Sequence, residues 1–173
     1  EKIAGVELSS GEKIFADVVL FNGDPRSLST GSLGSDYKKI TANTLHTERS
    51  FSARVWSFAA QIKGDDLIRH NVFFAENARS EFEDLKSGRM PLEPTIYVCA
   101  QDRGLNAGYP EKERFEIILN AAPVNKAVPV TQEFQKCLKL TLKTLEKFGV
   151  IFTPSPDPKT LTTPNMFAKM FPA

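Results

Sequence analysis

The alternation of hydrophobic and polar positions is clearest in the middle of the chain, where it predicts four β-strands. Residues 51–62 alternate with a period of two, which is typical of a strand whose successive side chains point to opposite faces. Three further strand-prone runs follow at residues 68–74, 95–101 and 114–121. Between the second and third strands, residues 77–87 have the spacing of a short amphipathic helix. We therefore expect an α+β fold in which helices pack on an antiparallel, four-stranded sheet.

The N-terminal segment has the pattern of a β-hairpin. Strand-prone residues 5–8 and 14–21 flank a polar, glycine-containing turn at 11–13. The second run ends in uninterrupted apolar residues, which predicts a strand that is buried on both faces. Since an isolated hairpin is only marginally stable in water, we expect it to pair with a sheet elsewhere. Residues 26–48 are rich in Ser, Thr and Gly and predict a connector, with one short helix at about 36–42.

The C-terminal part returns to helical spacing. The hydrophobic residues of 131–148 recur at helical intervals, with lysines on the outer side, and Gly149 can end the helix. We expect an extended segment at residues 152–158 and another short helix at 163–171.

Composition and charge exclude several classes of protein. The chain has 173 residues, of which 41% are hydrophobic, and 22 basic against 21 acidic residues leave a net charge of only +1. This balance excludes an intrinsically disordered chain and a purely electrostatic nucleic-acid binder. Cys99 and Cys137 are too few for a disulfide framework, and we expect reduced core thiols of a cytosolic protein. No apolar run approaches the roughly 18 residues of a membrane span, and we recognise no signal peptide.

Motifs with a known catalytic or metal-binding mechanism are absent from the sequence. It contains neither a G-x-G-x-x-G nor a G-x-x-x-x-G-K-[ST] run, and neither H-E-x-x-H nor C-x-x-C. His46 and His70, the two histidines, are not spaced to share a metal ion. Spacing alone therefore predicts no catalytic residue and no metal site.

Several candidate residues allow two interpretations. His70 can be a hydrogen-bonded sheet histidine, and Asp24 can form a turn before Pro25. The aromatic side chains of the predicted sheet can form either its core or the wall of an apolar ligand cavity. These aromatic residues are Trp56, Phe58, Phe73, Phe74 and Tyr97.

Three stretches of the sequence carry a resemblance to a known family. They are Ala16-Asp17-Val18-Val19 with Asn22-Gly23-Asp24-Pro25; Arg69-His70-Asn71-Val72-Phe73-Phe74 with Glu81-Phe82; and Pro94-Thr95-Ile96-Tyr97-Val98-Cys99-Ala100-Gln101-Asp102-Arg103 with Asn120-Ala121-Ala122-Pro123. In this order they resemble the flavin-dependent carotenoid desaturases of bacteria. The third stretch and the ending at residues 163–173 are similar to the branch that acts on hydroxy- and methoxyneurosporene.

The resemblance implies a flavin domain assembled from discontinuous segments, with a substrate domain inserted into it. On that template, residues 1–25 form a hairpin of the flavin-binding side, and residues 26–47 form a connector. Residues 48–123 form the substrate-binding sheet, and residues 124–173 form an amphipathic helix and a return segment toward the flavin domain. The glycine fingerprint that binds a dinucleotide pyrophosphate is missing. We therefore expect an internal fragment that neither binds FAD nor turns over by itself.

The resemblance also implies a reaction and its partners. The intact enzyme would use FAD to remove two hydrogens from a saturated carbon–carbon pair beside a polyene, with the cofactor supplying the chemistry. We expect a long apolar polyene as substrate, no nucleic acid, and a cytoplasmic protein peripherally associated with a membrane. Alternatives are a carotenoid isomerase, retinoid saturase or amine oxidase of the same superfamily, or a non-enzymatic lipid-binding module.

The resemblance suggests site residues as well. The expected substrate-contacting residues are Trp56, Phe58, His70, Phe73, Tyr97 and Arg103. The aromatic members would line an apolar tunnel. His70 and Arg103 would lie near a substrate end or a domain boundary. We expect Asn22 and Asp24 on the cofactor-binding side, and no catalytic residue or metal ligand.

Overall fold

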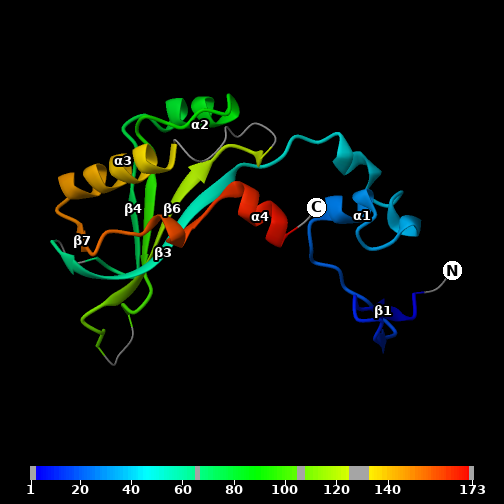
Figure 1. Cartoon of the computed structure of the whole chain (residues 1–173). Helices are drawn as coiled ribbons and strands as arrows, with labels where there is room; N and C mark the ends of the chain where they lie inside the picture. The colour runs from blue at the N-terminus through cyan, green and yellow to red at the C-terminus, as the bar shows by residue number, and fades with distance from the viewer. Residues whose placement is uncertain (1–2, 65–66, 105–107, 125–132, 172–173) are drawn as a thin grey trace. The chain divides into compact units, whose positions relative to one another are not determined.

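Contacts between residues divide the chain into two units, which Figure 1 traces along the sequence. The structure is a computed structural model, and it describes residues 3–64, 67–104, 108–124 and 133–171. The smaller unit contains the chain up to Thr47, and the larger unit is Glu48–Phe171. Within the described ranges, no helix is long and apolar enough to cross a membrane.

The larger unit is built on a six-stranded sheet. Its strands are β3 (Ser52–Lys63), β4 (His70–Phe73), β5 (Ile96–Ala100), β6 (Glu113–Ala121), β7 (Ile151–Thr153) and β8 (Leu161–Thr162). Their order is β4-β5-β6-β3-β7, with β8 also paired to β3, and every pairing is antiparallel. The predicted α+β class and antiparallel sheet are confirmed, whereas the predicted number of four strands is wrong. Strands β7 and β8 add to β3, and they are too short to show an alternation in the sequence.

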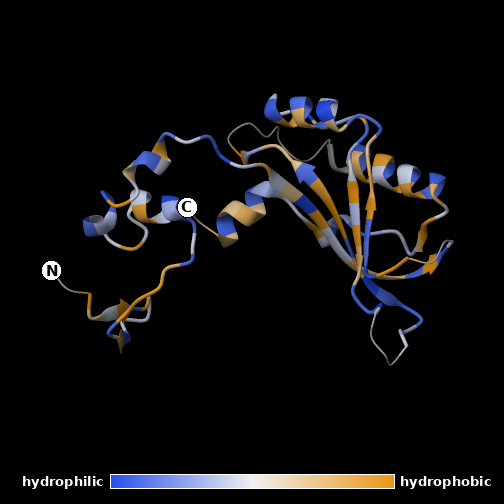
Figure 2. Cartoon of the chain, turned by 180° about the vertical axis from the view of Figure 1, so that it is seen from behind, coloured by the Kyte–Doolittle hydropathy of each residue, from blue (hydrophilic) through white to orange (hydrophobic). Residues whose placement is uncertain are grey.

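One face of this sheet packs against α3 (Glu133–Lys147) and forms the hydrophobic core. Strand pairing aligns Trp56 with Ile117 and Ile117 with Val98, and all three side chains are fully buried. The helix contributes an apolar stripe made up of Cys137, Leu138, Leu142 and Leu145. Figure 2 shows the hydrophobic bands of the strands and the hydrophobic side of α3. The helix agrees with the periodicity of the sequence, although the predicted start at residue 131 lies outside the described residues.

The ends of β3 and α3 meet backbone to backbone. Gly64 has a φ of +126°, and a Cβ atom at this position would lie 1.5 Å from the carbonyl oxygen of Gly149. Gly149 ends the helix with a φ of +75°, and the Val150 N–H then donates to the Leu145 carbonyl at 3.0 Å. The two glycines therefore allow the chain to turn from α3 into β7 beside β3.

The helix α2 (Ala78–Lys86) lies at one end of the sheet (Figure 1) and is held there by a buried carboxylate. Glu81 is 1% exposed. It accepts hydrogen bonds from the Thr95 hydroxyl at 2.7 Å and from the Asn120 side-chain amide at 3.2 Å. Because a buried carboxylate is costly without such partners, these contacts fix α2 near the start of β5 and the end of β6.

The smaller unit begins with a hairpin of β1 (Gly5–Glu7) and β2 (Lys13–Phe15). The structure shows a hairpin where the sequence predicted one, but β2 ends at Phe15 rather than at residue 21. Phe15, Val18 and Leu20 are 80%, 82% and 90% exposed, so the predicted burial on both faces is absent. The reason is that this hairpin forms a two-stranded sheet without further strands among the described residues.

Hydroxyl groups hold the connector together. It contains α1 (Pro25–Thr30) and the 3₁₀ turns η1 (Ser35–Tyr37) and η2 (Ala42–Leu45), in place of the single helix predicted at 36–42. The Ser29 hydroxyl lies 2.8 Å from the Thr41 hydroxyl and 2.7 Å from that of Thr44. Side-chain hydrogen bonds thus join α1 to η2 in a segment with few apolar residues.

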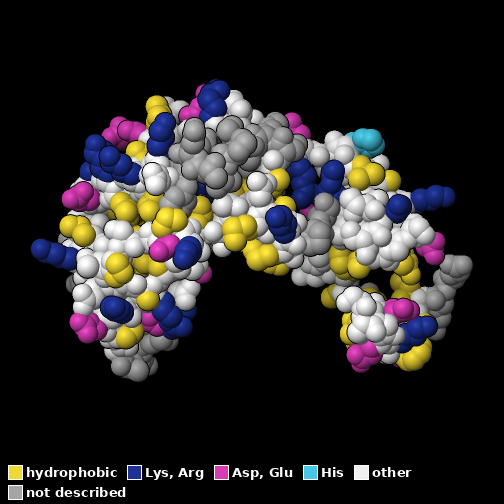
Figure 3. Space-filling model, in the orientation of Figure 1, with side chains coloured by type: hydrophobic (Ala, Val, Ile, Leu, Met, Phe, Trp, Pro, Cys, Tyr) yellow, Lys and Arg dark blue, Asp and Glu magenta, His cyan; other side chains and the backbone are white. Residues whose placement is uncertain are grey.

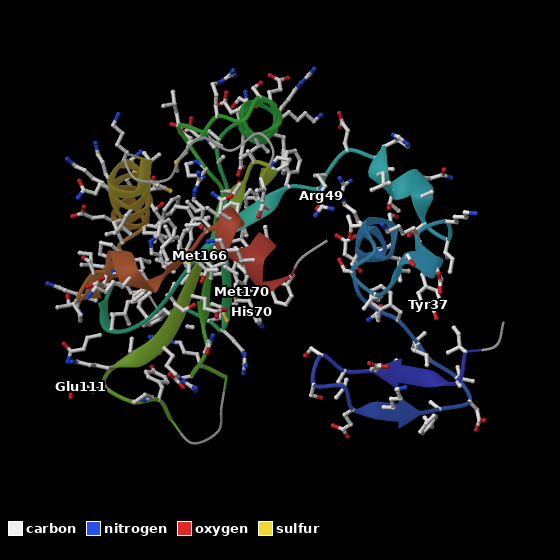
Figure 4. All side chains as sticks on the ribbon, turned by 45° about the vertical axis from the view of Figure 1, so that its right-hand side comes forward. Tyr37, Arg49, His70, Glu111, Met166 and Met170 are labelled. Atoms are coloured by element: carbon white, nitrogen blue, oxygen red, sulfur yellow. The ribbon has the colours of Figure 1, made fainter. Side chains whose placement is uncertain are left out.

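The described part of the chain ends in a turn, η4 (Pro158–Thr160), followed by β8 and by α4 (Pro164–Met170). Thr163 caps α4 by accepting a hydrogen bond from the Met166 N–H at 3.3 Å. Met166 and Met170 lie one turn apart and are exposed (Figure 4). The structure thus has a short helix where the sequence predicted one at 163–171.

Candidate functional site

The face of the larger sheet opposite α3 carries the candidate site, and we call it the open face. Along β3, even-numbered side chains such as Trp56 point into the core, and the odd-numbered ones point the other way. Strand pairing brings side chains of β4, β5 and β6 into register with the odd-numbered set. The open face is made up of Val55, Ser57, Ala59, His70, Val72, Tyr97, Cys99, Glu116 and Ile118.

One row across the open face is apolar apart from the hydroxyl of Tyr97. The register pairs Val72 with Tyr97, Tyr97 with Ile118, and Ile118 with Val55. Val72 is exposed, and the other three side chains are half-buried. Because neighbouring strands lie about 4.8 Å apart, this apolar row extends for roughly 15 Å across four strands.

The adjacent row is polar. The register pairs His70 with Cys99, Cys99 with Glu116, and Glu116 with Ser57, whose hydroxyl lies 3.5 Å from Glu116 Oε1. His70, labelled in Figure 4, places its Nδ1 2.6 Å from the Tyr97 hydroxyl. The two rings are inclined by only 24°, with centroids 6.1 Å apart. The apolar and polar rows therefore meet at the His70–Tyr97 pair.

The surroundings of Tyr97 keep its hydroxyl protonated. Burial raises the pKa of this hydroxyl most, and the Cys99 thiol and the Glu116 carboxylate raise it further, against a smaller lowering by Arg69. Tyr97 can thus donate a hydrogen bond at neutral pH. No group of three His, Cys, Asp or Glu side chains in the described part of the chain could hold a metal ion.

Ion pairing marks the end of the open face that lies away from α2. The Asp102 carboxylate accepts hydrogen bonds from the Arg114 backbone N–H at 2.7 Å and from its Nε at 3.0 Å, and it also contacts the terminal Nη2. The Arg114 side chain lowers the pKa of Asp102, and Asp102 in turn raises the pKa of Arg114. Polarity on this face therefore increases from the apolar row toward Arg114.

The predicted substrate residues divide between the two faces of the sheet. His70 and Tyr97 lie together on the open face, whereas Trp56, Phe58 and Phe73 lie on the side of the core. Trp56 is fully buried. Phe58 packs edge-on against Phe152 with ring centroids 5.2 Å apart, and Phe73 contacts Phe148 at 5.1 Å. Contact of these three core residues with a substrate stays a prediction.

Arg103, the other predicted polar contact, is buried in an ion pair. Its Nε and Nη2 donate to the Glu113 carboxylate at 2.7 and 2.9 Å, and its Nη1 donates to the Leu67 carbonyl at 2.6 Å. The guanidinium also lies 4.7 Å from the ring centroid of Tyr109. An open groove of about 630 Å³ borders this pair and is lined by Gln61, Ile62, Lys63, Gly64, Arg103, Tyr109, Pro110, Glu111, Glu113 and Thr153.

The predicted cofactor residues lie in the smaller unit. Asp24 accepts a hydrogen bond from the Arg26 N–H at 2.9 Å and caps α1, and Asn22 is exposed. Their role in cofactor binding stays a prediction. A dinucleotide site needs a glycine-rich turn between a strand and a helix. Among the described residues, the segments that lead into α1, α2 and α4 contain at most one glycine each, so they do not fit FAD by themselves.

Sequence reasoning missed three of the four residues of the polar row. Cys99, Glu116 and Ser57 lie in three different strands, and only the strand register brings them side by side. The alternation of each strand predicts which residues share a face, but the pairing partners have no local signal.

Comparison with known proteins first defines a class. No protein-family model matches the chain. Among curated proteins, a phytoene desaturase of Phycomyces blakesleeanus is 28% identical over 85% of this chain and 26% of its own length. The chain is therefore similar to a carotenoid desaturase, which agrees with the resemblance found in its motifs.

The similarity is stronger to one kind of carotenoid desaturase. Hydroxyneurosporene desaturases of Cereibacter sphaeroides and Rhodobacter capsulatus are 41% and 40% identical, each over 99% of this chain and 34% of its own length. A third, from Rubrivivax gelatinosus, is 38% identical. The chain thus spans about a third of the length of these relatives and is homologous to that part of a hydroxyneurosporene desaturase.

Proposed function

We propose that this chain forms the substrate-facing sheet of an FAD-dependent carotenoid desaturase, which introduces carbon–carbon double bonds into a long polyene. The observation that carries the proposal is the 38–41% identity to three hydroxyneurosporene desaturases over 99% of the chain. By the same similarity, the proposed substrate is a hydroxyneurosporene-type polyene.

The open face supports this proposal. Sites for apolar ligands are mostly hydrophobic, with a few polar groups that fix orientation. The apolar row has this composition, and the small side chains of Ser57 and Ala59 beside it leave space against β3. Val72 belongs to a contiguous apolar row, and a contiguous apolar patch often marks a binding site. We propose that the polyene covers part of this row.

The proposal divides the work between this chain and the cofactor. FAD, the cofactor that the family resemblance implies, supplies the removal of two hydrogens when it is bound. The described residues do not fit FAD by themselves, so we assign them no step at the cofactor. Their contribution is to bind the polyene along the apolar row, to orient it and to exclude water.

A membrane surface is the proposed source of the substrate, because a long polyene dissolves in lipid rather than in water. The exposed Met166, Met170 and Phe171 at the end of the larger unit support a peripheral contact with lipid. On the side shown in Figure 3, basic and acidic side chains are interspersed with hydrophobic ones. This mixture favours an apolar partner over a nucleic acid.

The activity can be tested with the intact enzyme that contains this chain, produced in cells that make hydroxyneurosporene. We expect a product that has lost two hydrogens, measured by chromatography and mass spectrometry. A product of unchanged mass but altered double-bond geometry would identify an isomerase instead. Recovery of unchanged hydroxyneurosporene from enzyme that contains its full complement of flavin would overturn the proposal.

A pair of matched variants tests the role of the open face. Val72→Asp places a charge on the apolar row and should lower turnover about tenfold or more, because the carboxylate must lose water when the polyene binds. Leu92→Asp makes a comparable change at a side chain that is 82% exposed and lies outside the open face. Turnover should be unchanged in this control. Equal turnover in the two variants would contradict the assignment.

A further inference from the structure

The His70–Tyr97 pair has hydrogen-bonding capacity that the described residues leave open. Nδ1 of His70 and the Tyr97 hydroxyl lie 2.6 Å apart, and Nε2 of His70 makes no hydrogen bond within the described part of the chain. If the phenol donates to Nδ1, Nε2–H remains as a donor and the phenol oxygen as an acceptor. If Nδ1–H donates instead, the phenol hydroxyl is the donor and Nε2 the acceptor. Nε2 of His70 is therefore open as a donor or as an acceptor, and the phenol, which also interacts with the Cys99 thiol, takes the opposite role.

A hydroxyl group has the matching capacity, because it carries one donor and two acceptor lone pairs. Because it can either donate or accept, it can bond to the open group that it approaches, Nε2 or the phenol, whichever tautomer is present. A hydrocarbon at the same place satisfies neither, and it also excludes the water that would otherwise bind them. The pair is thus suited to distinguish a hydroxylated polyene from an unsubstituted one.

The position of the pair agrees with this role. Tyr97 lies in the apolar row between Val72 and Ile118, so an apolar chain on this row passes directly over the phenol ring. His70 lies on the edge strand β4 in the polar row, whose next members are Cys99 and Glu116. The raised pKa of Tyr97 keeps its proton available for hydrogen bonding. A hydroxyl substituent can therefore reach the pair while its hydrocarbon chain stays on the apolar row.

We propose that His70 and Tyr97 bind the hydroxyl oxygen of the substrate and make the enzyme specific for hydroxylated polyenes. This inference rests on the proposed function, because it assigns a specificity site to the same open face. It concerns the choice of substrate, and the pair takes no part in the removal of hydrogen.

The test compares two substrates in the same variant of the intact enzyme. Tyr97→Phe removes one oxygen and keeps the ring, and His70→Phe removes both ring nitrogens. In each variant, kcat/KM for hydroxyneurosporene relative to neurosporene should fall about tenfold, the equivalent of one net hydrogen bond. The amount of each polyene retained by the purified enzyme, measured after extraction, should change in the same ratio. A purely structural defect would lower kcat/KM for both substrates by the same factor and leave their ratio unchanged.

The chain offers matched controls in its smaller unit. Tyr37→Phe and His46→Phe make the same chemical changes at residues outside the open face, and both should keep the wild-type ratio. Equal losses for the two polyenes, or an unchanged ratio in both test variants, would overturn the inference and leave the desaturase assignment intact. A wild-type enzyme that desaturates neither polyene would refute the proposed function, and the inference with it.

Discussion

Replacing Arg103 is the most direct test of how the larger sheet is stabilised. Arg103 is 8% exposed and Glu113 is 3% exposed, and two hydrogen bonds of 2.7 and 2.9 Å join their charged groups. Arg103→Leu would leave the Glu113 carboxylate buried without its counter-charge. Breaking a buried pair in this way costs about 3–5 kcal/mol. The variant also loses the hydrogen bond to the Leu67 carbonyl, so we expect a loss toward the upper end of this range.

The double variant Arg103→Leu, Glu113→Leu separates the ion pair from the packing. With both charges removed, no unpaired charge remains in the interior, and most of the loss should be recovered. The surface pair Arg79 and Glu83 provides a control, since its side chains are 88% and 62% exposed. Arg79→Ala should change the free energy of unfolding by about 0.5 kcal/mol or less.

Hydrogen exchange of the β6 amides measures the loss of stability within the sheet itself, even if the intact enzyme unfolds in several steps. We expect much faster exchange in Arg103→Leu, and nearly normal exchange in the double variant. If β6 protection stays normal in Arg103→Leu while KM for the polyene rises, the ion pair is not structural. Arg103 would then be the substrate contact that the sequence suggested.

Three further predictions concern other charged groups. Glu81→Ala leaves the Thr95 hydroxyl and the Asn120 amide without their acceptor and should lower the free energy of unfolding by about 1–3 kcal/mol; Glu83→Ala on the exposed side of α2 should change it little, and urea denaturation compares the two. Asp24→Ala should destabilise α1 by about 1 kcal/mol and Asp24→Ser much less, because serine also caps helices; flavin lost from the serine variant would instead indicate a cofactor contact. The pKa of Asp102 is lowered in the folded state, so the Asp102 carboxylate stabilises the fold above its unfolded pKa of about 4, and this stabilisation is lost as the pH falls further. An acid titration of unfolding should show this loss of stability in the wild-type protein and not in Asp102→Asn.

The sequence predicted the elements whose periodicity extends over two or more turns or pleats. The alternation at residues 51–62 corresponds to β3, and the helical spacing after residue 131 corresponds to α3. Strands β7 and β8 have two or three residues, too few for a period to be visible. The apolar run 14–21 predicted a long buried strand, but burial depends on a partner sheet that local sequence does not contain.

The site was harder to predict than the fold because both faces of β3 carry apolar residues. Trp56 and Phe58 are larger than Val55 and Ala59, and their size suggested a ligand wall. Large aromatic side chains give the greatest stabilisation when they are buried, so their size is equally typical of the core. Which face α3 covers depends on the connection between distant segments. The strand alternation alone does not contain that information.

The division between the two faces explains how one sheet can be rigid and still bind a slender ligand. On the core side, the rings of Phe58, Phe115 and Phe152 form a cluster with centroids 4.9–5.9 Å apart. This packing holds β3, β6 and β7 in position relative to one another. On the open face, short side chains such as Ser57 and Ala59 add little bulk above β3. A long substrate can therefore lie close to the backbone of a sheet whose geometry is already determined by packing on the other side. Specificity then needs only a few polar groups at a fixed position, and the strand register supplies that position.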